Sequence, residues 1–151
     1  MCRCASRVGY FPLGKGIDLY LNGANCYSRG TIEHELLHAL GFWHEHTRPD
    51  RDHYITILWN NVVRGKEYNF KKRGDPGDWT LQLPYDYGSV MHYRPAAFSR
   101  DGSSPTLLAT DPAAAASMGQ RVRASNLDLA KLNRLYRCPY PFYKGEDLVR
   151  G

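Results

Sequence analysis

The residues with the clearest chemistry lie at positions 34–44, where the sequence has the pattern H-E-x-x-H-x-x-G-x-x-H. This pattern supplies one carboxylate, from Glu35, and three imidazoles, from His34, His38 and His44. Three imidazoles can hold a zinc ion and leave a fourth coordination position open, with the glutamate beside it as a base. The pattern therefore indicates a zinc-dependent peptide hydrolase.

A helix must bring the first two histidines together. Because each residue of a helix advances by about 100 degrees, His34 and His38 lie one turn apart on the same face. We expect this helix over residues 31–42. Gly41 can adopt a positive φ and end the helix, so that the chain turns back and His44 reaches the same ion.

The opposite side of the predicted helix is apolar and suits burial in a core. It consists of Ile32, Leu36, Ala39 and Leu40. Two alternatives to a catalytic site are a structural zinc site and a buried helix whose histidines contact only backbone groups. Structural zinc sites usually close with four ligands and often use cysteine, so an open three-histidine site suits catalysis better.

Other segments extend the pattern to a family likeness. Glu45 directly follows His44, and residues 89–93 read S-x-M-H-Y. Residues 119–121 read G-Q-R, and residues 135–138 read L-Y-R-C. Together these motifs resemble the astacin family of metzincin endopeptidases, and the likeness runs from about Cys4 to Cys138.

The resemblance implies roles for the matching residues. Glu35 corresponds to the general base that takes a proton from the attacking water and passes it to the leaving amine. Tyr93 corresponds to an additional tyrosine ligand of the metal, which donates to the oxyanion during the reaction. The ligands of one zinc ion per chain would be His34, His38 and His44.

The neighbours of these residues have simpler interpretations as well. Met91 is apolar and flexible, so packing alone explains it, and the family likeness places it as a hydrophobic floor under the histidines. Glu45 could be an ordinary surface charge, but the likeness implies a buried carboxylate that receives the amino terminus of the matured enzyme. We expect His46 and His53 to lie at the surface or to be hydrogen-bonded, and we assign no ligand role to His92.

The four cysteines are Cys2, Cys4, Cys26 and Cys138, which allow three fully paired connectivities. The resemblance implies a disulfide between Cys4 and Cys26. In the family, the cysteine that corresponds to Cys138 pairs with a cysteine upstream of the residues present here. Cys138 is therefore expected to be free or paired with Cys2. Disulfides form in oxidising compartments, so we expect a secreted or extracellular protein, although no signal peptide precedes Cys2 in this chain.

The fold implied by the resemblance is an α+β fold of the metzincin type, with two subdomains flanking an active-site cleft. By comparison with the family, we expect the first part of the catalytic domain to be missing and the upper subdomain to be incomplete. The peptidase domain would then cover residues 1–138, followed by a short C-terminal tail at 139–151.

Local patterns place further elements. Residues 17–21 alternate apolar and polar side chains, which predicts a strand, and residues 4–8 could form its neighbour. Residues 54–63 stay undecided between strand and irregular structure. The alanine run at 113–116, inside an irregular stretch at 101–118, could be a helical turn or a flexible filler.

A capping box at 125–128 predicts the start of a final helix. Its apolar stripe is expected to pack in the core and consists of Leu129, Leu132, Leu135 and Tyr136.

Length and composition agree with one modest globular domain. The chain has 151 residues, of which 42% are hydrophobic and 13% are aromatic, enough for a core. The net charge is +5, but basic residues alternate with acidic ones, so we expect no nucleic-acid partner. No apolar run approaches the roughly 18 residues of a membrane span, and none is expected.

The sequence therefore predicts a zinc endopeptidase whose partners are protein or peptide substrates. The main alternative is a catalytically inactive zinc-binding interaction module, a truncated isoform or fragment of such an enzyme. Intact Glu35 and Tyr93 argue against a site that has decayed by mutation.

Overall fold

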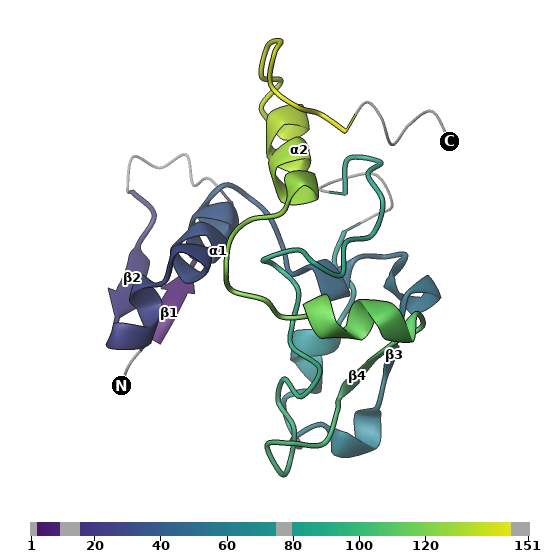
Figure 1. The fold of residues 1–151 in the computed structure, drawn as a ribbon. Coiled ribbons are helices and arrows are strands. Elements are labelled where there is room, and N and C mark those ends of the chain that lie inside the picture. The colour runs from purple at the N-terminus through teal and green to yellow at the C-terminus, as the bar shows by residue number, and fades with distance from the viewer. Residues whose placement is uncertain (1–2, 10–15, 75–79, 146–151) are drawn as a thin grey trace.

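The computed structural model describes residues 3–9, 16–74 and 80–145, and it has an α+β architecture (Figure 1). Two antiparallel two-stranded sheets lie at opposite sides of the molecule, with helix α1 (Arg29–Ala39) beside the first of them. Helix α2 (Asn126–Leu135) follows near the C-terminus. The expected fold class is confirmed.

The first sheet pairs β1 (Arg3–Ser6) with β2 (Leu19–Asn22), and Cys4 is opposite Leu21. Both strands were predicted, and each is displaced by one or two residues from the expected ranges. A disulfide joins Cys4 to Cys26, with the two Cα atoms 5.5 Å apart. Because Cys26 lies in the 3₁₀ turn η1 (Ala24–Tyr27), the disulfide fastens this sheet to the segment that precedes α1.

Helix α1 ends as the sequence predicts, and a serine caps its start. The Ser28 hydroxyl caps its N-terminus by accepting the Thr31 backbone N–H at 3.3 Å. Gly41, with a φ of +102°, follows its C-terminus. The helix starts two residues earlier and ends three residues earlier than expected.

The expected burial of the apolar side of α1 is partly wrong. Leu36 is 47% exposed, whereas Leu37 and the metal-facing histidines His34 and His38 are buried. The sheet on the other side has only two strands of four residues, which is too small to cover that whole face.

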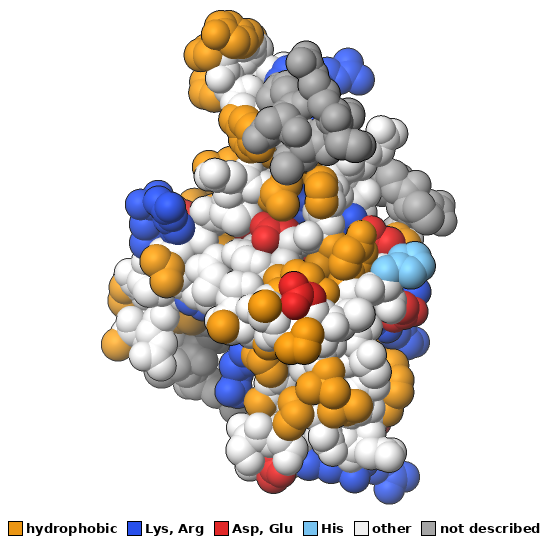
Figure 2. Space-filling model, turned by 45° about the vertical axis from the view of Figure 1, so that its right-hand side comes forward, with side chains coloured by type: hydrophobic (Ala, Val, Ile, Leu, Met, Phe, Trp, Pro, Cys, Tyr) orange, Lys and Arg blue, Asp and Glu red, His pale blue; other side chains and the backbone are white. Residues whose placement is uncertain are grey.

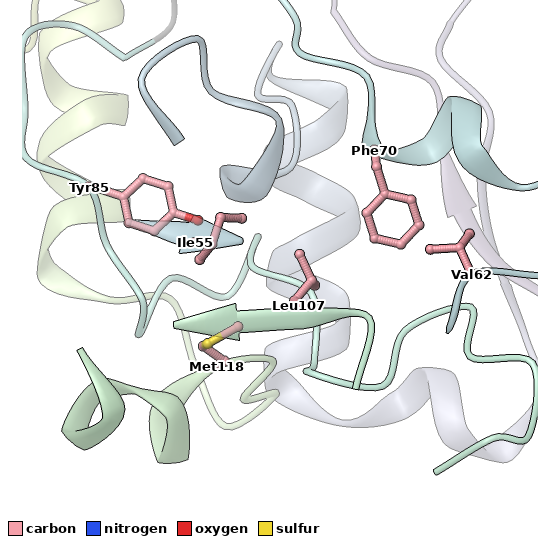
Figure 3. Close-up of a cluster of buried hydrophobic side chains, with 6 residues drawn as sticks. All are labelled: Ile55, Val62, Phe70, Tyr85, Leu107 and Met118. Atoms are coloured by element: carbon pink, nitrogen blue, oxygen red, sulfur yellow. The ribbon is translucent and has the colours of Figure 1, made fainter. Parts of the chain in front are cut away.

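The second sheet anchors the larger part of the molecule. Strand β3 (Ile55–Ile57) pairs with β4 (Leu107–Ala109), and the 3₁₀ turn η4 (Trp59–Asn61) follows β3, so the undecided segment 54–63 contains both. Figure 3 shows Ile55 and Leu107 meeting in the cluster that these strands build. Its buried members are Ile55, Val62, Phe70, Tyr85, Leu107 and Met118.

Between the second sheet and α2, the stretch expected to be irregular contains regular structure. Strand β4 lies inside it, and the alanine run belongs to the 3₁₀ helix η6 (Pro112–Ser117). The Asp111 carboxylate caps η6 by accepting the Ala113 N–H at 3.0 Å. The helical-turn alternative is therefore the correct one. The remaining 3₁₀ turns are η2 (Glu45–Thr47), η3 (Arg51–His53) and η5 (Glu67–Phe70).

The capping box that opens α2 is confirmed. The Ser125 hydroxyl accepts the Asp128 N–H at 2.9 Å, and the Asp128 carboxylate accepts the Ser125 N–H at 2.9 Å. The expected burial of the apolar stripe is partly wrong. Leu132 packs against the cluster around Leu37 and Phe42, but Leu129 is 45% exposed and Tyr136 is 52% exposed. The buried residues are Asp128, Ala130 and Lys131.

The described part of the C-terminal tail is fastened to α2. The Asn133 side-chain amide donates to the Tyr143 carbonyl at 2.7 Å, and the Arg134 Nε donates to the Lys144 carbonyl at 2.5 Å. Cys138 is free, and Cys2, its suggested partner, lies outside the described residues.

Charged side chains are mixed, rather than gathered in one place, on the face drawn in Figure 2. On the face drawn in Figure 2, lysine and arginine side chains lie at several separate positions among acidic and hydrophobic ones. This distribution agrees with the alternation of basic and acidic residues along the sequence. Within the described ranges no helix combines the length and the apolar character that crossing a membrane requires.

Candidate metal centre

The three histidines of the motif converge on one point. The Nε2 atom of His44 lies 3.1 Å from that of His38 and 3.3 Å from that of His34. Across the described residues, these three are the group whose His, Cys, Asp or Glu ligand atoms could hold a metal ion. Helix α1 supplies two of them, and the turn at Gly41 returns the chain so that His44 supplies the third.

Backbone carbonyl groups fix the orientation of two of the rings. His34 Nδ1 lies 2.8 Å from the Val90 carbonyl, and His38 Nδ1 lies 2.8 Å from the Phe42 carbonyl. A carbonyl can only accept, so each Nδ1 carries the proton and each Nε2 presents a lone pair. Such a second contact on a histidine ring is typical of metal ligands.

The cluster fits a zinc ion. At most one hydrogen, on His44, is available to three nitrogens that face each other, so the donor set lacks the protons to satisfy itself by hydrogen bonds. A four-coordinate ion with Zn–N bonds of about 2.0–2.1 Å places its ligand nitrogens about 3.3 Å apart, close to the separations found here. One cation at the centre would satisfy all three lone pairs.

Burial prepares these histidines for a metal. It lowers the pKa of His34 to about 3, with the nearby His38 and Arg121 charges adding to the effect. Burial also lowers the pKa of His38, and it lowers the pKa of His44 well below its usual value. The rings are therefore neutral at neutral pH, the form that binds metal.

Glu35 and Arg121 place opposite charges beside the histidines. Glu35 is 5% exposed, and its charge raises the pKa of the neighbouring Arg121, against a larger lowering by burial. The Arg121 guanidinium donates from one nitrogen to the His92 carbonyl at 3.2 Å and to the Gln120 carbonyl at 2.8 Å.

The position of Arg121 depends on a close backbone approach. A Cβ atom on Gly30, in the first turn of α1, would lie 2.1 Å from the Arg121 carbonyl oxygen. Only glycine allows α1 to pack this closely. The sequence offered Arg121 only as part of a family motif, with no sign that it lies beside the site.

Tyr93 lies against the third histidine. Its ring centroid is 4.5 Å from that of His44 and 3.9 Å from that of His46, on which it stacks. Burial raises the pKa of the Tyr93 phenol to about 12. The side chain therefore keeps its O–H proton at neutral pH.

The sequence agrees with this geometry, because the sequence model of the astacin peptidase family matches residues 1–137. The chain belongs to the astacin family. The expected membership and the expected zinc cofactor of this family are thereby confirmed.

Several relatives support this placement. The chain is 46% identical to human meprin A subunit beta over 135 residues, which cover 89% of this chain and 19% of meprin. It is 45% identical to human tolloid-like protein 1 over 141 residues, which cover 91% of this chain and 14% of the relative. The chain thus spans about a fifth or less of these relatives' length.

A solved structure supports the same fold. High choriolytic enzyme 1 of Oryzias latipes, a hatching enzyme zinc-protease, superposes with a TM-score of 0.81 at 38% identity. The superposition covers 92% of this chain and 66% of the hatching enzyme.

The first four residues of the astacin-like S-x-M-H-Y motif, 89–92, are buried, and Tyr93 is half-buried. Met91 is 2% exposed and packs in a cluster with Leu37 of α1 and Phe42. His92 is fully buried, and both of its ring nitrogens have protein partners: Nδ1 donates to the Tyr93 carbonyl, and Nε2 accepts the Tyr85 hydroxyl at 2.7 Å. These two contacts leave His92 no nitrogen for a metal, in agreement with the absence of an assigned ligand role.

The two histidines expected at the surface or in hydrogen bonds differ. His53 is exposed, but His46 has no exposed surface, and its Nε2 donates to the Asn69 carbonyl at 3.0 Å. For His46 the hydrogen-bonded alternative is therefore the correct one, and its ring stacks on that of Tyr93.

Glu45 is buried, as the astacin likeness implied, and it is 1% exposed. Its Oε2 accepts the Lys131 ammonium at 2.5 Å, and its Oε1 accepts the Arg48 guanidinium at 3.1 Å and the Asp86 N–H at 3.0 Å. Charged partners from this chain's own residues therefore occupy both oxygens of the carboxylate that was expected to receive an amino terminus.

Proposed function

We propose that this chain is a zinc endopeptidase that hydrolyses peptide bonds in protein substrates. The observation that carries the proposal is the convergence of three Nε2 atoms, from His34, His38 and His44, near the buried Glu35. The membership of the astacin family and the zinc-protease relative support it. When bound by these histidines, zinc would supply a Lewis acid and acidify a water molecule.

Glu35 is the proposed general base. It directly follows His34 on α1 and is buried, so its carboxylate is held next to the metal ligands rather than in bulk solvent. It takes the proton of the attacking water on a carboxylate oxygen and then delivers it to the departing amine nitrogen.

Tyr93 is the proposed oxyanion donor and an additional metal ligand at rest. Its raised pKa keeps the phenol protonated, so its O–H can donate to the negative charge that develops on the carbonyl oxygen. The stack on the His46 ring supports one face of the Tyr93 ring and so restricts its orientation. Met91 supports the site from the hydrophobic cluster behind α1.

A pocket beside Tyr93 favours acidic substrate side chains. It has a volume of about 280 Å³, enough for one side chain, and its lining includes Arg94 and Arg121. A Cβ on Gly119 would lie 2.4 Å from the Arg94 Cα, so the backbones of these two lining residues are in close contact. Among the described residues that line the pocket, two carry guanidinium groups and none carries a carboxylate, so an Asp or Glu side chain is the complementary occupant.

Two further questions are the compartment of the protein and the choice between an active enzyme and an inactive zinc-binding module. The Cys4–Cys26 disulfide supports an oxidising, extracellular setting. An inactive zinc-binding module is the alternative function. An intact base, an intact phenol and a neutral ligand set favour the enzyme instead.

Digestion of a peptide library by the purified zinc-loaded chain tests this proposal. We expect the wild type to cleave, and Glu35→Gln to bind zinc at the wild-type ratio but to lose cleavage. Glu33→Gln is the matched control, because Glu33 lies on the same helix and its carboxylate binds Arg29 at 2.7 Å and the Ala124 N–H. A wild-type chain that binds zinc and cleaves nothing would instead establish the inactive module.

A further inference from the structure

The buried face of α2 is polar, which is unusual for a helix packed against a core. Asp128 is 3% exposed and Lys131 is 1% exposed, and the two lie one turn apart on the same face. Burying charged groups is costly unless they are paired and hydrogen-bonded. What these two side chains bind therefore indicates why they are buried.

Asp128 binds the turn that runs over residues 89–91. Its Oδ1 accepts the Ser89 hydroxyl at 2.6 Å, and its Oδ2 accepts the Val90 N–H at 2.9 Å. The Ser89 hydroxyl oxygen in turn accepts the Met91 N–H at 3.0 Å. One carboxylate thus fixes all three residues of the turn.

This turn also orients a metal ligand. The Val90 carbonyl accepts the Nδ1 proton of His34 at 2.8 Å. Asp128 holds the N–H of the same residue whose carbonyl holds the imidazole, so Val90 is fixed on both sides. A continuous chain of hydrogen bonds therefore runs from Asp128 through Val90 to His34.

Lys131 makes a parallel connection to the third ligand. Its ammonium pairs with Glu45, the residue after His44, and the Glu45 N–H donates to the Met91 carbonyl at 3.1 Å. Helix α2 is thus connected both to the turn at 89–91 and to the segment that carries His44. Together the two connections fix the position of α2 relative to His34 and His44.

We propose that Asp128 is a positioning residue of the metal centre, which fixes the orientation of the His34 ring through Ser89 and Val90. The proposal rests on the zinc site of the proposed function, but not on peptide cleavage. Its physical basis is preorganisation: a ligand ring that is already aimed loses less freedom when the metal binds. Asp128 touches neither metal nor substrate, so its effect must appear in metal affinity and ligand geometry.

Asp128→Asn is the variant that tests the proposal, in the full chain. The amide NH₂ of asparagine cannot accept, so at least one of the Ser89, Val90 and Ser125 donors loses its partner. We expect zinc affinity, measured by competition with a chromogenic chelator, to fall about 10- to 100-fold. The visible absorption spectrum of the cobalt-substituted variant should also change, because it reports ligand geometry.

Ser125→Ala is the matched control. It removes the hydroxyl that caps the same end of α2 but leaves the Asp128 contacts to Ser89 and Val90 in place. We expect this control to lower the melting temperature while zinc affinity stays within about twofold of wild type. A structural role for Asp128 in α2 alone would make the two variants behave alike, and that result overturns the proposal.

Two further outcomes are decisive. Asp128→Asn with unchanged zinc affinity and an unchanged cobalt spectrum overturns the proposal. Should this variant not fold, Ser89→Ala decides, because it removes the Oδ1 contact and the Met91 acceptor but leaves the carboxylate. A fall in zinc affinity of about threefold or more for Ser89→Ala supports the positioning role, and unchanged affinity refutes it. Because none of these readouts uses cleavage, they stand apart from the test of peptidase activity.

Discussion

The ring of Tyr93 lies on the ring of His46, with centroids 3.9 Å apart and an angle of 28° between the planes. His46 is fully buried and is itself held by the Asn69 carbonyl. The Tyr93 ring, which also lies against that of His44, therefore rests on a fixed surface. Phe70 closes the group by meeting both rings edge to face.

Replacing Tyr93 with phenylalanine should remove the oxyanion donor but keep the stack. We expect kcat to fall about 100-fold, with a much smaller change in KM, because the phenol donates only in the transition state. Steady-state kinetics on one peptide measure both constants. Tyr87→Phe is the control, since it removes the hydroxyl that donates to the Tyr54 carbonyl at 2.6 Å and should leave kcat unchanged. An effect of Tyr93→Phe on KM alone would contradict the donor role.

Replacing Arg121 with glutamine should change substrate preference. We expect kcat/KM to fall about tenfold for peptides with Asp or Glu next to the scissile bond, and to change little for peptides with neutral residues there. Arg121→Lys should retain much of the preference, because it keeps the charge. Digestion of matched acidic and neutral peptides gives the ratio. Equal losses on both peptides would mean that Arg121 supports the metal site rather than the pocket.

Acid should destabilise the protein when a chelator has removed the metal. The folded-state pKa is lowered to about 3 for His34 and for His46, and it is also lowered for His38, His44 and His92, mainly by burial. The unfolded chain, with histidine pKa values near about 6.5, therefore binds more protons below that pH. Stability is fully present above about pH 6.5 and is lost as the pH falls towards about 3.

Urea unfolding of the chelator-treated protein between pH 7.5 and pH 5 measures this loss. Each such histidine contributes up to about 1.4 kcal/mol per pH unit within the window. His46→Gln should reduce the slope by about one proton, because it removes one of the buried imidazoles. A pH-independent free energy of unfolding would show that these rings are not neutral in the fold.

Removing the Cys4–Cys26 disulfide should weaken the part of the protein around β1, β2 and the start of α1. The disulfide closes a loop with a sequence separation of 22 residues, so the Cys4→Ser, Cys26→Ser double variant should lose about 3 kcal/mol of stability. Chemical unfolding under non-reducing conditions checks the value. Cys138→Ser is the control, because Cys138 is free, and it should leave the unfolding midpoint unchanged.

The local chemistry of the site could be predicted from the sequence. His34 and His38 are one turn apart on any helix, and Gly41 can reverse the chain after it, so the convergence of His44 follows from short-range geometry. The capping box at Ser125 is equally local, because it needs only residues three positions apart. The Cys4–Cys26 disulfide was implied by the family likeness, and the structure contains it.

Only the tertiary structure decided which faces are buried and which distant residues meet. The apolar side of α2 suggested a core stripe, yet the charged Asp128 and Lys131 are buried, because their partners Val90 and Glu45 come from segments far away in the chain. The place of Arg121 likewise depends on a backbone approach at Gly30. Helical periodicity is a property of neighbouring residues, whereas burial depends on long-range packing, which a single sequence does not reveal.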